Sequence, residues 1–314
     1  MPWPNPRIPY EMTSERKRLR PLDGKSLIVH VVLNVEYWPF DGQMPRAVIP
    51  APHGRSPVPD IGNYGWVEYG MRAGMPRIMR LLAEREIKAS AFMNAYCADV
   101  YPQCAEAMLE AGWEFVGHCW IQRSLNAEDD EREIIEKSAE RLELLTGKKT
   151  RGWLGAGIGE TFHTPDILKE CGIDWLADFC VDDLPVWIRT KHGPLIGMPY
   201  TMEINDVPIW AVQQQSSDEM FRRVEATVSV LERELDDNPR VLTIALHPHL
   251  VGVPHRAYWL AKTLDLLLDR DDTIFVTGSD IADWFRAADG TDGQEVMDAD
   301  ADEVGWSHLL EIRT

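Results

Sequence analysis

The sequence is poor in basic residues and has no long hydrophobic run. It contains 32 Lys and Arg against 51 Asp and Glu, a formal net charge of -19 over 314 residues. Such an acidic chain repels phosphate backbones and anionic lipids, so neither nucleic acid nor a membrane is expected as a partner. The longest apolar stretch, residues 27–33, is far shorter than the ~20 residues that span a bilayer. Because the first residues lack the apolar core of a secretory signal, we expect a cytoplasmic protein.

Cysteine pairs and several common catalytic motifs are also missing. The five cysteines form no Cys-x-x-Cys pair, which argues against a disulfide framework and a four-cysteine zinc site. We interpret Cys119, beside His118, as a buried thiol and not as a nucleophile. The chain has no Gly-x-Ser-x-Gly elbow, no His-Glu-x-x-His and no phosphate-binding loop. Serine hydrolases, zincins and P-loop enzymes are therefore excluded.

Apolar strands alternate with amphipathic helices over most of the chain. Residues 26–35, SLIVHVVLNV, have the near-continuous apolar character of a strand buried on both faces. This rhythm predicts a parallel sheet, either doubly wound or closed as a (β/α) barrel. Further strands are expected at 89–94, 114–117, 151–154, 175–179, 241–247 and 273–277, with helices between them.

The composition suggests one domain with an extension at each end. Residues 1–24 are rich in Pro and Arg and are interpreted as an arm that lies on the domain or on a neighbouring subunit. Residues 25–288 would form the catalytic barrel, and the acidic residues 289–314 are expected to be a flexible or weakly held tail. The long segment 36–73 is rich in Pro, Gly and aromatic residues. We expect it to cover the active site.

Polar side chains follow the predicted strands where the strands end. Glu36, Asn94, His118 and His247 each come directly after an apolar segment. Because the carboxyl ends of parallel strands meet at one edge of a sheet, these side chains should share a site. His30, in the middle of the first strand, is interpreted as a core histidine.

Five segments carry a resemblance to the polysaccharide deacetylase family. They are Asn34-Val35-Glu36, Gly117-His118-Cys119-Trp120, Arg151-Gly152-Trp153, Asp182-Asp183-Leu184-Pro185-Val186-Trp187 and Leu246-His247-Pro248-His249, in the family's order. The resemblance covers roughly residues 26–286 and implies an α/β fold, a distorted (β/α)7 barrel in one domain. In that family an aspartate pair and a His-x-x-x-His motif hold a divalent metal, and a late histidine acts as general acid.

The chain departs from this pattern at the metal site. Asn34 stands where the family's catalytic aspartate is expected, Glu36 replaces a metal-binding aspartate, and Gln122 replaces the second histidine. A metal such as zinc would keep only Glu36 and His118, a poor ligand set, so we expect no cofactor. The departures resemble the metal-independent bacterial allantoinases and cyclic imide hydrolases. This resemblance implies ring opening of a cyclic ureide or imide by a homo-oligomer, with a tetramer favoured.

Three residues are assigned to the chemistry. Glu36 either is the general base or orients His118 as the base, and His247 stabilises the oxyanion or protonates the departing nitrogen. The amides are expected to match the polar edge of an imide, the tryptophans to stack on its ring, and the charged groups to bind ring N–H groups or a substrate oxygen. The predicted substrate-binding residues are Asn34, Asn94, Trp120, Gln122, Trp153, Asp183 and Arg256.

Two other functions stay open at this stage. One is a metal-dependent N-deacetylase of an amino sugar, which the missing metal ligand and the missing secretory signal oppose. The other is a barrel that binds carbohydrate or protein without catalysis, which twelve tryptophans would suit. The polar strand ends argue against mere binding. The residues do not rank allantoin, hydantoin and succinimide-like rings as substrates.

Overall fold

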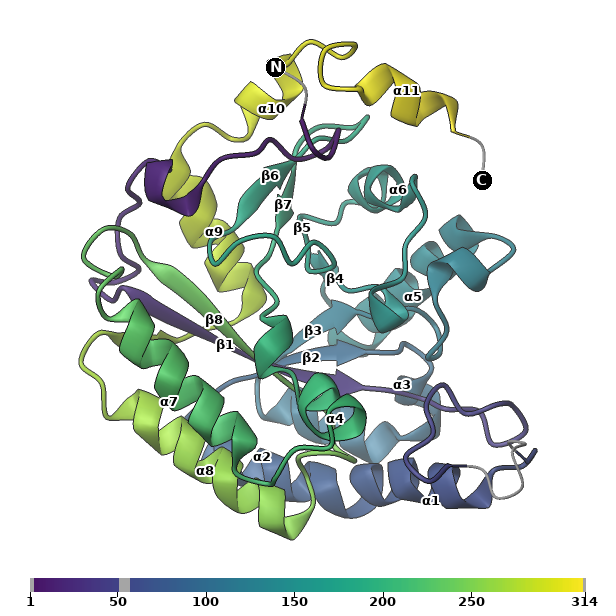
Figure 1. The fold of residues 1–314 in the computed structure, drawn as a ribbon. Coiled ribbons are helices and arrows are strands. Elements are labelled where there is room, and N and C mark those ends of the chain that lie inside the picture. The colour runs from purple at the N-terminus through teal and green to yellow at the C-terminus, as the bar shows by residue number, and fades with distance from the viewer. Residues whose placement is uncertain (1–2, 51–56, 313–314) are drawn as a thin grey trace.

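The strands form one curled sheet surrounded by helices (Figure 1). The computed structural model describes residues 3–50 and 57–312. The strands are β1 (Leu27–Val35), β2 (Ser90–Met93), β3 (Glu114–Gly117), β4 (Gly152–Trp153), β5 (Trp175–Leu176), β6 (Val186–Ile188), β7 (Leu195–Gly197), β8 (Arg240–Leu246) and β9 (Thr273–Phe275).

Parallel pairing joins seven of these strands in the order β8-β1-β2-β3-β4-β5-β7. β6 adds to β7 in the antiparallel sense, and β9 runs beside the first residues of β1 while β2 runs beside its last. No pair between β8 and β6 closes the sheet within the described residues. The sheet is therefore a curled, open barrel, which confirms the predicted single-domain α/β fold.

Helices cover the outside of this sheet. Figure 1 shows α2, α7 and α8 along one side of β1 and β8, with α9 on the other side. The helices that line up with predicted ones are α2 (Met75–Ala83), α4 (Pro102–Glu110), α5 (Glu131–Thr146), α6 (Thr164–Glu170), α7 (Glu219–Leu231), α8 (Pro254–Leu268) and α9 (Gly278–Asp289). Those that the sequence did not predict are α1 (Ile61–Tyr69), α3 (Cys97–Val100), α10 (Gln294–Asp298) and α11 (Trp306–Glu311).

Short helical turns complete the chain. The 3-10 turns are η1 (Thr13–Glu15), η4 (Leu125–Ala127), η5 (Ala156–Ile158) and η6 (Met202–Ile204), and the π-helical segments are η3 (Gly70–Gly74) and η7 (Val207–Val212). Because α1 and η3 occupy residues 61–74, the loop after β1 is shorter than the predicted segment 36–73. Part of that loop, residues 51–56, lies outside the described residues.

Strand β1 divides its side chains between two packed layers. Successive side chains of a strand point to opposite faces, and one face of β1 packs with the helices while the other enters the barrel interior. His30 lies on the interior face with Nε2 2.8 Å from the Ser90 Oγ. Burial lowers the pKa of His30 to about 3, although Asp280 opposes the shift. This confirms His30 as a neutral core residue.

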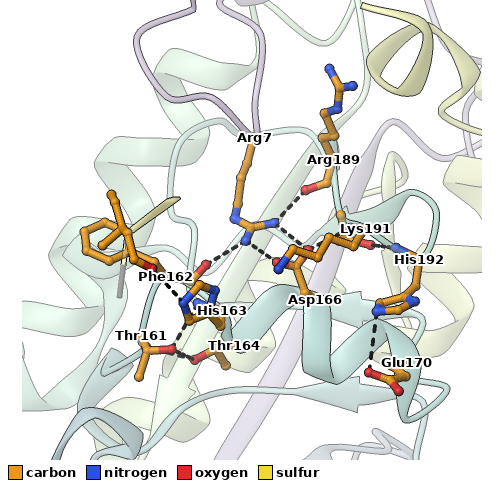
Figure 2. A network of polar contacts seen from close by, with 12 residues as sticks. Arg7, Thr161, Phe162, His163, Thr164, Asp166, Glu170, Arg189, Lys191 and His192 are labelled. Atoms are coloured by element: carbon orange, nitrogen blue, oxygen red, sulfur yellow. Dashed lines mark hydrogen bonds and ion pairs between the residues drawn. The ribbon is translucent and has the colours of Figure 1, made fainter. Parts of the chain in front are cut away.

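The two ends of the chain pack on the barrel and on each other. Arg7 of the arm forms a buried ion pair with Asp166, with Nη2 2.8 Å from Oδ2, and donates to the Arg189 carbonyl (Figure 2). The guanidinium groups of Arg7 and Arg189 lie 4.9 and 5.1 Å from the ring centre of Trp306. Trp306 is buried with Val304 and its neighbours in α11. This apolar cluster packs the described part of the tail, and the expectation of a flexible or weakly held tail stays a prediction.

None of the helices in the described part of the chain is long and apolar enough to cross a membrane.

Candidate active site

Three ionisable side chains meet at the carboxyl ends of the strands because strand geometry points them inward. Glu36 follows β1, His118 follows β3 and His247 follows β8. Each lies two residues beyond an interior position, and a period of two keeps it on the interior face. Those interior positions are occupied by Asn34, Val116 and Ala245.

Glu36 is held between two imidazole rings. Its Oε1 lies 3.4 Å from His247 Nε2 and 3.8 Å from His118 Nε2, and only 6% of the residue is exposed. Its other oxygen, Oε2, accepts a hydrogen bond of 2.8 Å from the Trp38 indole. Burial acts to raise the pKa of Glu36, but the two histidines outweigh it and hold the pKa well below its ordinary value. Glu36 is therefore a carboxylate at neutral pH.

His247 is fixed by a second, fully buried carboxylate. Asp206 accepts from the His247 backbone N–H at 2.7 Å and from the ring Nδ1–H at 2.6 Å. Burial acts to lower the pKa of His247, yet Asp206 and Glu36 together raise it to about 10. The ring is thus an imidazolium whose Nε2–H faces Glu36. This geometry orients an acid and a base side by side.

His118 lies behind Glu36 and not on the cavity wall. Its Nδ1 is 2.8 Å from the carbonyl oxygen of Leu154, and because a carbonyl only accepts, Nδ1 carries the proton. The opposite nitrogen, Nε2, is buried, faces Glu36 and has no hydrogen-bond partner among the described residues. The catalytic role predicted for His118 stays a prediction.

A cavity of about 170 Å3 opens beside Glu36 and His247. The wall combines one carboxylate, two imidazoles, a guanidinium, an amide and an indole. The residues are Glu36, Trp38, Pro45, Arg46, Gln122, Ser124, Ala156, Gly157, Val207, His247 and His249. Of the predicted substrate-binding residues, Gln122 lines this cavity.

Known proteins share this fold and part of this sequence. The polysaccharide deacetylase family model matches residues 64–175. A Schizosaccharomyces pombe protein named as a polysaccharide deacetylase is 27% identical over 256 residues, 75% of this chain and 80% of that protein. The structure of PuuE allantoinase matches with a TM-score of 0.76 at 26% identity, and that of a probable polysaccharide deacetylase from Pseudomonas aeruginosa PAO1 with 0.77 at 25%. Each match covers 87% of this chain and 95% of the other.

These matches show that the chain is similar to the polysaccharide deacetylase family. This confirms the resemblance that the sequence motifs indicated, including the similarity to an allantoinase. Both activities named among these relatives are hydrolytic, which supports a hydrolase.

The family's metal site is not reproduced in this chain. Within residues 3–50 and 57–312, no group of three or more His, Cys, Asp or Glu is placed to hold a metal ion. His247 would have to release the proton that Asp206 and Glu36 stabilise, and Gln122 offers a neutral amide. His118 Nε2 and Glu36 remain as two donors, fewer than the three protein ligands of an ordinary catalytic zinc site. The residues that the structure describes do not fit a resident metal.

Two residues predicted to contact substrate, Asn34 and Asn94, hold strand ends through their side-chain amides. Asn34 is buried and donates to the Tyr200 hydroxyl at 3.1 Å and to the carbonyl of Leu246, which ties β1 to β8. Asn94 accepts from the Tyr37 N–H at 2.9 Å and donates to the His118 carbonyl. Neither amide lines the cavity. Both hold the strand ends that carry Glu36 and His118.

Four further residues predicted to bind substrate are absent from the lining of this cavity. Trp153 is fully buried against Gly117, where an added Cβ would lie 2.3 Å from its ring, so it supports the strand before His118. Trp120 packs on Tyr96 and under Lys137.

Asp183 and Arg256 are displaced for other reasons. The Asp183 carbonyl accepts from Val241 N at the start of β8, the opposite end of the strand from His247. Arg256 donates to the Leu250 carbonyl and lies 4.8 Å from the ring centre of Trp210. Trp120, Trp153, Asp183 and Arg256 thus do not line the cavity beside Glu36 and His247, and their contact with substrate stays a prediction.

The sequence interpretation missed Asp206, Arg46 and the part played by His249. Asp206 sits outside any strand, and a single bridge between Asn205 and Ala245 brings it beside β8. His249 is buried edge-on to Trp38 and Trp66, at ring-centre distances of 5.4 and 4.5 Å. Burial lowers the pKa of His249 to about 3, helped by the charge of His247, so this ring is neutral. Its spacing of two residues from His247 was the available signal.

Cys119 is buried, and burial raises the pKa of its thiol to about 12. It is therefore no nucleophile, as the sequence indicated.

Proposed function

We propose that the protein hydrolyses the ring C–N bond of a small cyclic amide, an allantoin-like ureide or a cyclic imide, by general acid and base catalysis. The observation that carries this proposal is the position of Glu36 Oε1 between the Nε2 atoms of His118 and His247. A carboxylate and an imidazolium side by side provide a base and an acid at neutral pH. Ring opening by water needs one of each.

Glu36 is the base in this proposal. Trp38 occupies its Oε2, which leaves Oε1 to take a proton from a water in the cavity. The water oxygen then bonds to the ring carbonyl carbon, and the carbonyl π electrons move to its oxygen. His118 packs behind Glu36, and Leu154 fixes the imidazole ring by accepting from Nδ1.

His247 supplies the acid. Its Nε2–H donates to the oxyanion that forms on the carbonyl oxygen, a role in which preorganised donors lower the barrier most. The carbonyl then re-forms, the C–N bond breaks with its electron pair on nitrogen, and that nitrogen takes the proton of His247 Nε2. Glu36 passes the proton that it took from water to Nε2, 3.4 Å from its Oε1, so both groups regain their starting states. Asp206 stabilises the imidazolium throughout and prevents the ring from turning.

The cavity favours a single small ring over a sugar polymer. Its volume of about 170 Å3 suits a molecule of roughly ring size, whereas typical drug-sized sites are several times larger. Gln122 and the neutral His249 provide uncharged donors and acceptors on its wall. The similarity to an allantoinase over 87% of the chain supports the same substrate class.

Deacetylation of an amino sugar is the second candidate, because a probable polysaccharide deacetylase matches this chain as well as the allantoinase does. The test is a turnover screen of the purified protein with cyclic ureides, cyclic imides and acetylated amino sugars, each with and without chelator. Hydrolysis of the rings that persists with chelator is the expected result. Release of acetate from the sugars that needs added metal, without any ring opening, would overturn the proposal.

A further inference from the structure

One cation on the cavity wall has no part in the steps above. Arg46 lines the cavity with Glu36 and His247, yet its guanidinium has no ion-pair or hydrogen-bond partner within the described residues. Other half-buried or buried arginines of the chain are matched, as Arg7 is with Asp166 and Arg151 with Asp174. A guanidinium offers five N–H donors in a planar fork. Arg46 therefore presents unused donors to whatever occupies the cavity.

The segment that carries Arg46 is anchored close behind it. The backbone N–H groups of Val48 and Ile49 both donate to the Asn63 side-chain oxygen, at 2.7 and 3.0 Å. Asn63 is buried in α1, and its amide nitrogen donates to Asp60 at 2.7 Å and back to the Ile49 carbonyl. Arg46 thus enters the cavity from a segment held by three hydrogen bonds to and from the Asn63 side chain.

The charged groups on the cavity wall are positive, except for Glu36, the proposed catalytic base. Glu36 contributes one negative charge, whereas His247 and Arg46 are cations and His249 is neutral. In the proposed reaction His247 serves the reacting carbonyl, so its donor is already assigned. Arg46 is the remaining cation. Arg256, which the sequence suggested as a ligand for a substrate oxygen, donates to the Leu250 carbonyl and lies over the Trp210 ring.

We propose that Arg46 is a specificity-determining residue that binds a planar, oxygen-bearing substituent on the substrate ring, a carboxylate or a ureido group. This inference rests on the proposed ring-opening function and narrows its substrates to substituted rings. Because Arg46 and Glu36 line one cavity of about 170 Å3, the substituent and the reacting carbonyl belong to the same small molecule. Bare hydantoin or succinimide leaves the guanidinium without a partner and is a poor substrate.

Three rings built on one scaffold test the assignment. Hydantoin has no substituent, hydantoin-5-acetate carries a carboxylate, and allantoin carries a ureido group. We expect kcat/KM of the native protein to be at least about tenfold higher for one or both substituted rings than for hydantoin. Arg46→Gln should remove about 10- to 100-fold of kcat/KM for the favoured ring, the usual range for a hydrogen bond to a charged group. The same variant should change hydantoin hydrolysis by less than about twofold.

Two further variants sharpen the comparison. Arg46→Lys keeps the charge but loses the planar fork, so it should recover less than half of the lost preference. Arg72→Gln removes an exposed arginine that pairs with Glu68 outside the cavity, and it should leave all three rates unchanged. Which substituted ring is preferred identifies the carboxylate or the ureido group as the chemistry recognised. Equal losses on all three rings in Arg46→Gln, or a native enzyme without preference, would overturn the assignment.

Failure of the proposed function gives a different result. If the native protein opens none of the rings, the ring-opening reaction is refuted. Calorimetric binding of the same rings to the native protein and to Arg46→Gln then decides the role of Arg46 alone. Tighter binding of a substituted ring that is lost in the variant supports the assignment, and equal or absent binding refutes it.

Discussion

Replacing Asp206 by Asn should remove the negative charge that stabilises the protonated ring of His247, the proposed acid. Asp206 is fully buried and contacts His247 twice, through the backbone N–H and ring Nδ1. With Glu36 it raises the pKa of His247 from 6.5 to about 10 against the effect of burial. This difference corresponds to roughly 5 kcal/mol in favour of the protonated ring, at about 1.4 kcal/mol for each tenfold change.

The wild-type rate should therefore be flat over a wide range of pH. Glu36 has a pKa well below its ordinary value, so it is ionised at all but strongly acidic pH, and His247 stays protonated up to about pH 10. In Asp206→Asn one of the two anions is gone, so the alkaline limb of kcat/KM should move down by about one pH unit or more. We also expect kcat to fall by roughly 10²- to 10⁴-fold, the range for a misoriented catalytic histidine.

Stability should follow the same linkage. The folded pKa of His247 lies above its unfolded value, so its contribution is complete below pH 6.5 and is lost as the pH rises through about 10. Urea titrations of the native protein and Asp206→Asn across this range measure that contribution. Asp183→Asn, at the other end of the sheet, is the control. An alkaline limb that stays in place in a folded Asp206→Asn protein would refute the reasoning.

Four further outcomes follow from the site and the chain ends. Glu36→Gln should lower kcat by ~10²-fold or more with the fold intact, whereas His30→Asn should lower stability and leave turnover unchanged; equal kcat in the two variants would contradict this. Chelator treatment should not reduce ring hydrolysis, and stoichiometric zinc whose removal abolishes activity would oppose that expectation. Arg7→Met should reduce the free energy of unfolding by about 3–5 kcal/mol, because it leaves Asp166 buried and unpaired; a loss below ~1 kcal/mol in urea titrations would disagree. Light scattering should show a homo-oligomer, with a tetramer favoured, and a protein beginning at Asp23 tests the arm in assembly; a monomer at micromolar concentration would be the contrary finding.

The fold and the centre of the site could be predicted because they depend on short-range patterns. Continuous apolar runs mark the longest buried strands, and the residue after each run is carried to one edge of the parallel sheet. Glu36 and His247 were found in this way, and the period of two places both on the barrel interior. His118 was found by the same rule.

The remaining contacts depend on geometry that no local pattern encodes. Asp206 lies in an irregular segment, and only its distant pairing with β8 brings it to His247. Trp153 is an aromatic residue of the kind that stacks on a substrate ring. It packs in the core, however, because Gly117 has no side chain in the space that the Trp153 ring occupies. Asp183 belongs to a family-like motif but lies at the amino end of β8. Arg46 comes from a loop without periodicity, where the sequence gives no direction for a side chain.

Mass spectrometry of the reaction products tests the central claim most directly. Opening a ring by water yields one product, heavier than the substrate by a single water, whereas deacetylation yields two, acetate and an amine. The native protein should convert a substituted cyclic ureide or imide into the one heavier product in the presence of chelator, and Glu36→Gln should not. Acetate and an amine from an acetylated amino sugar, with every cyclic substrate unchanged, would contradict the account.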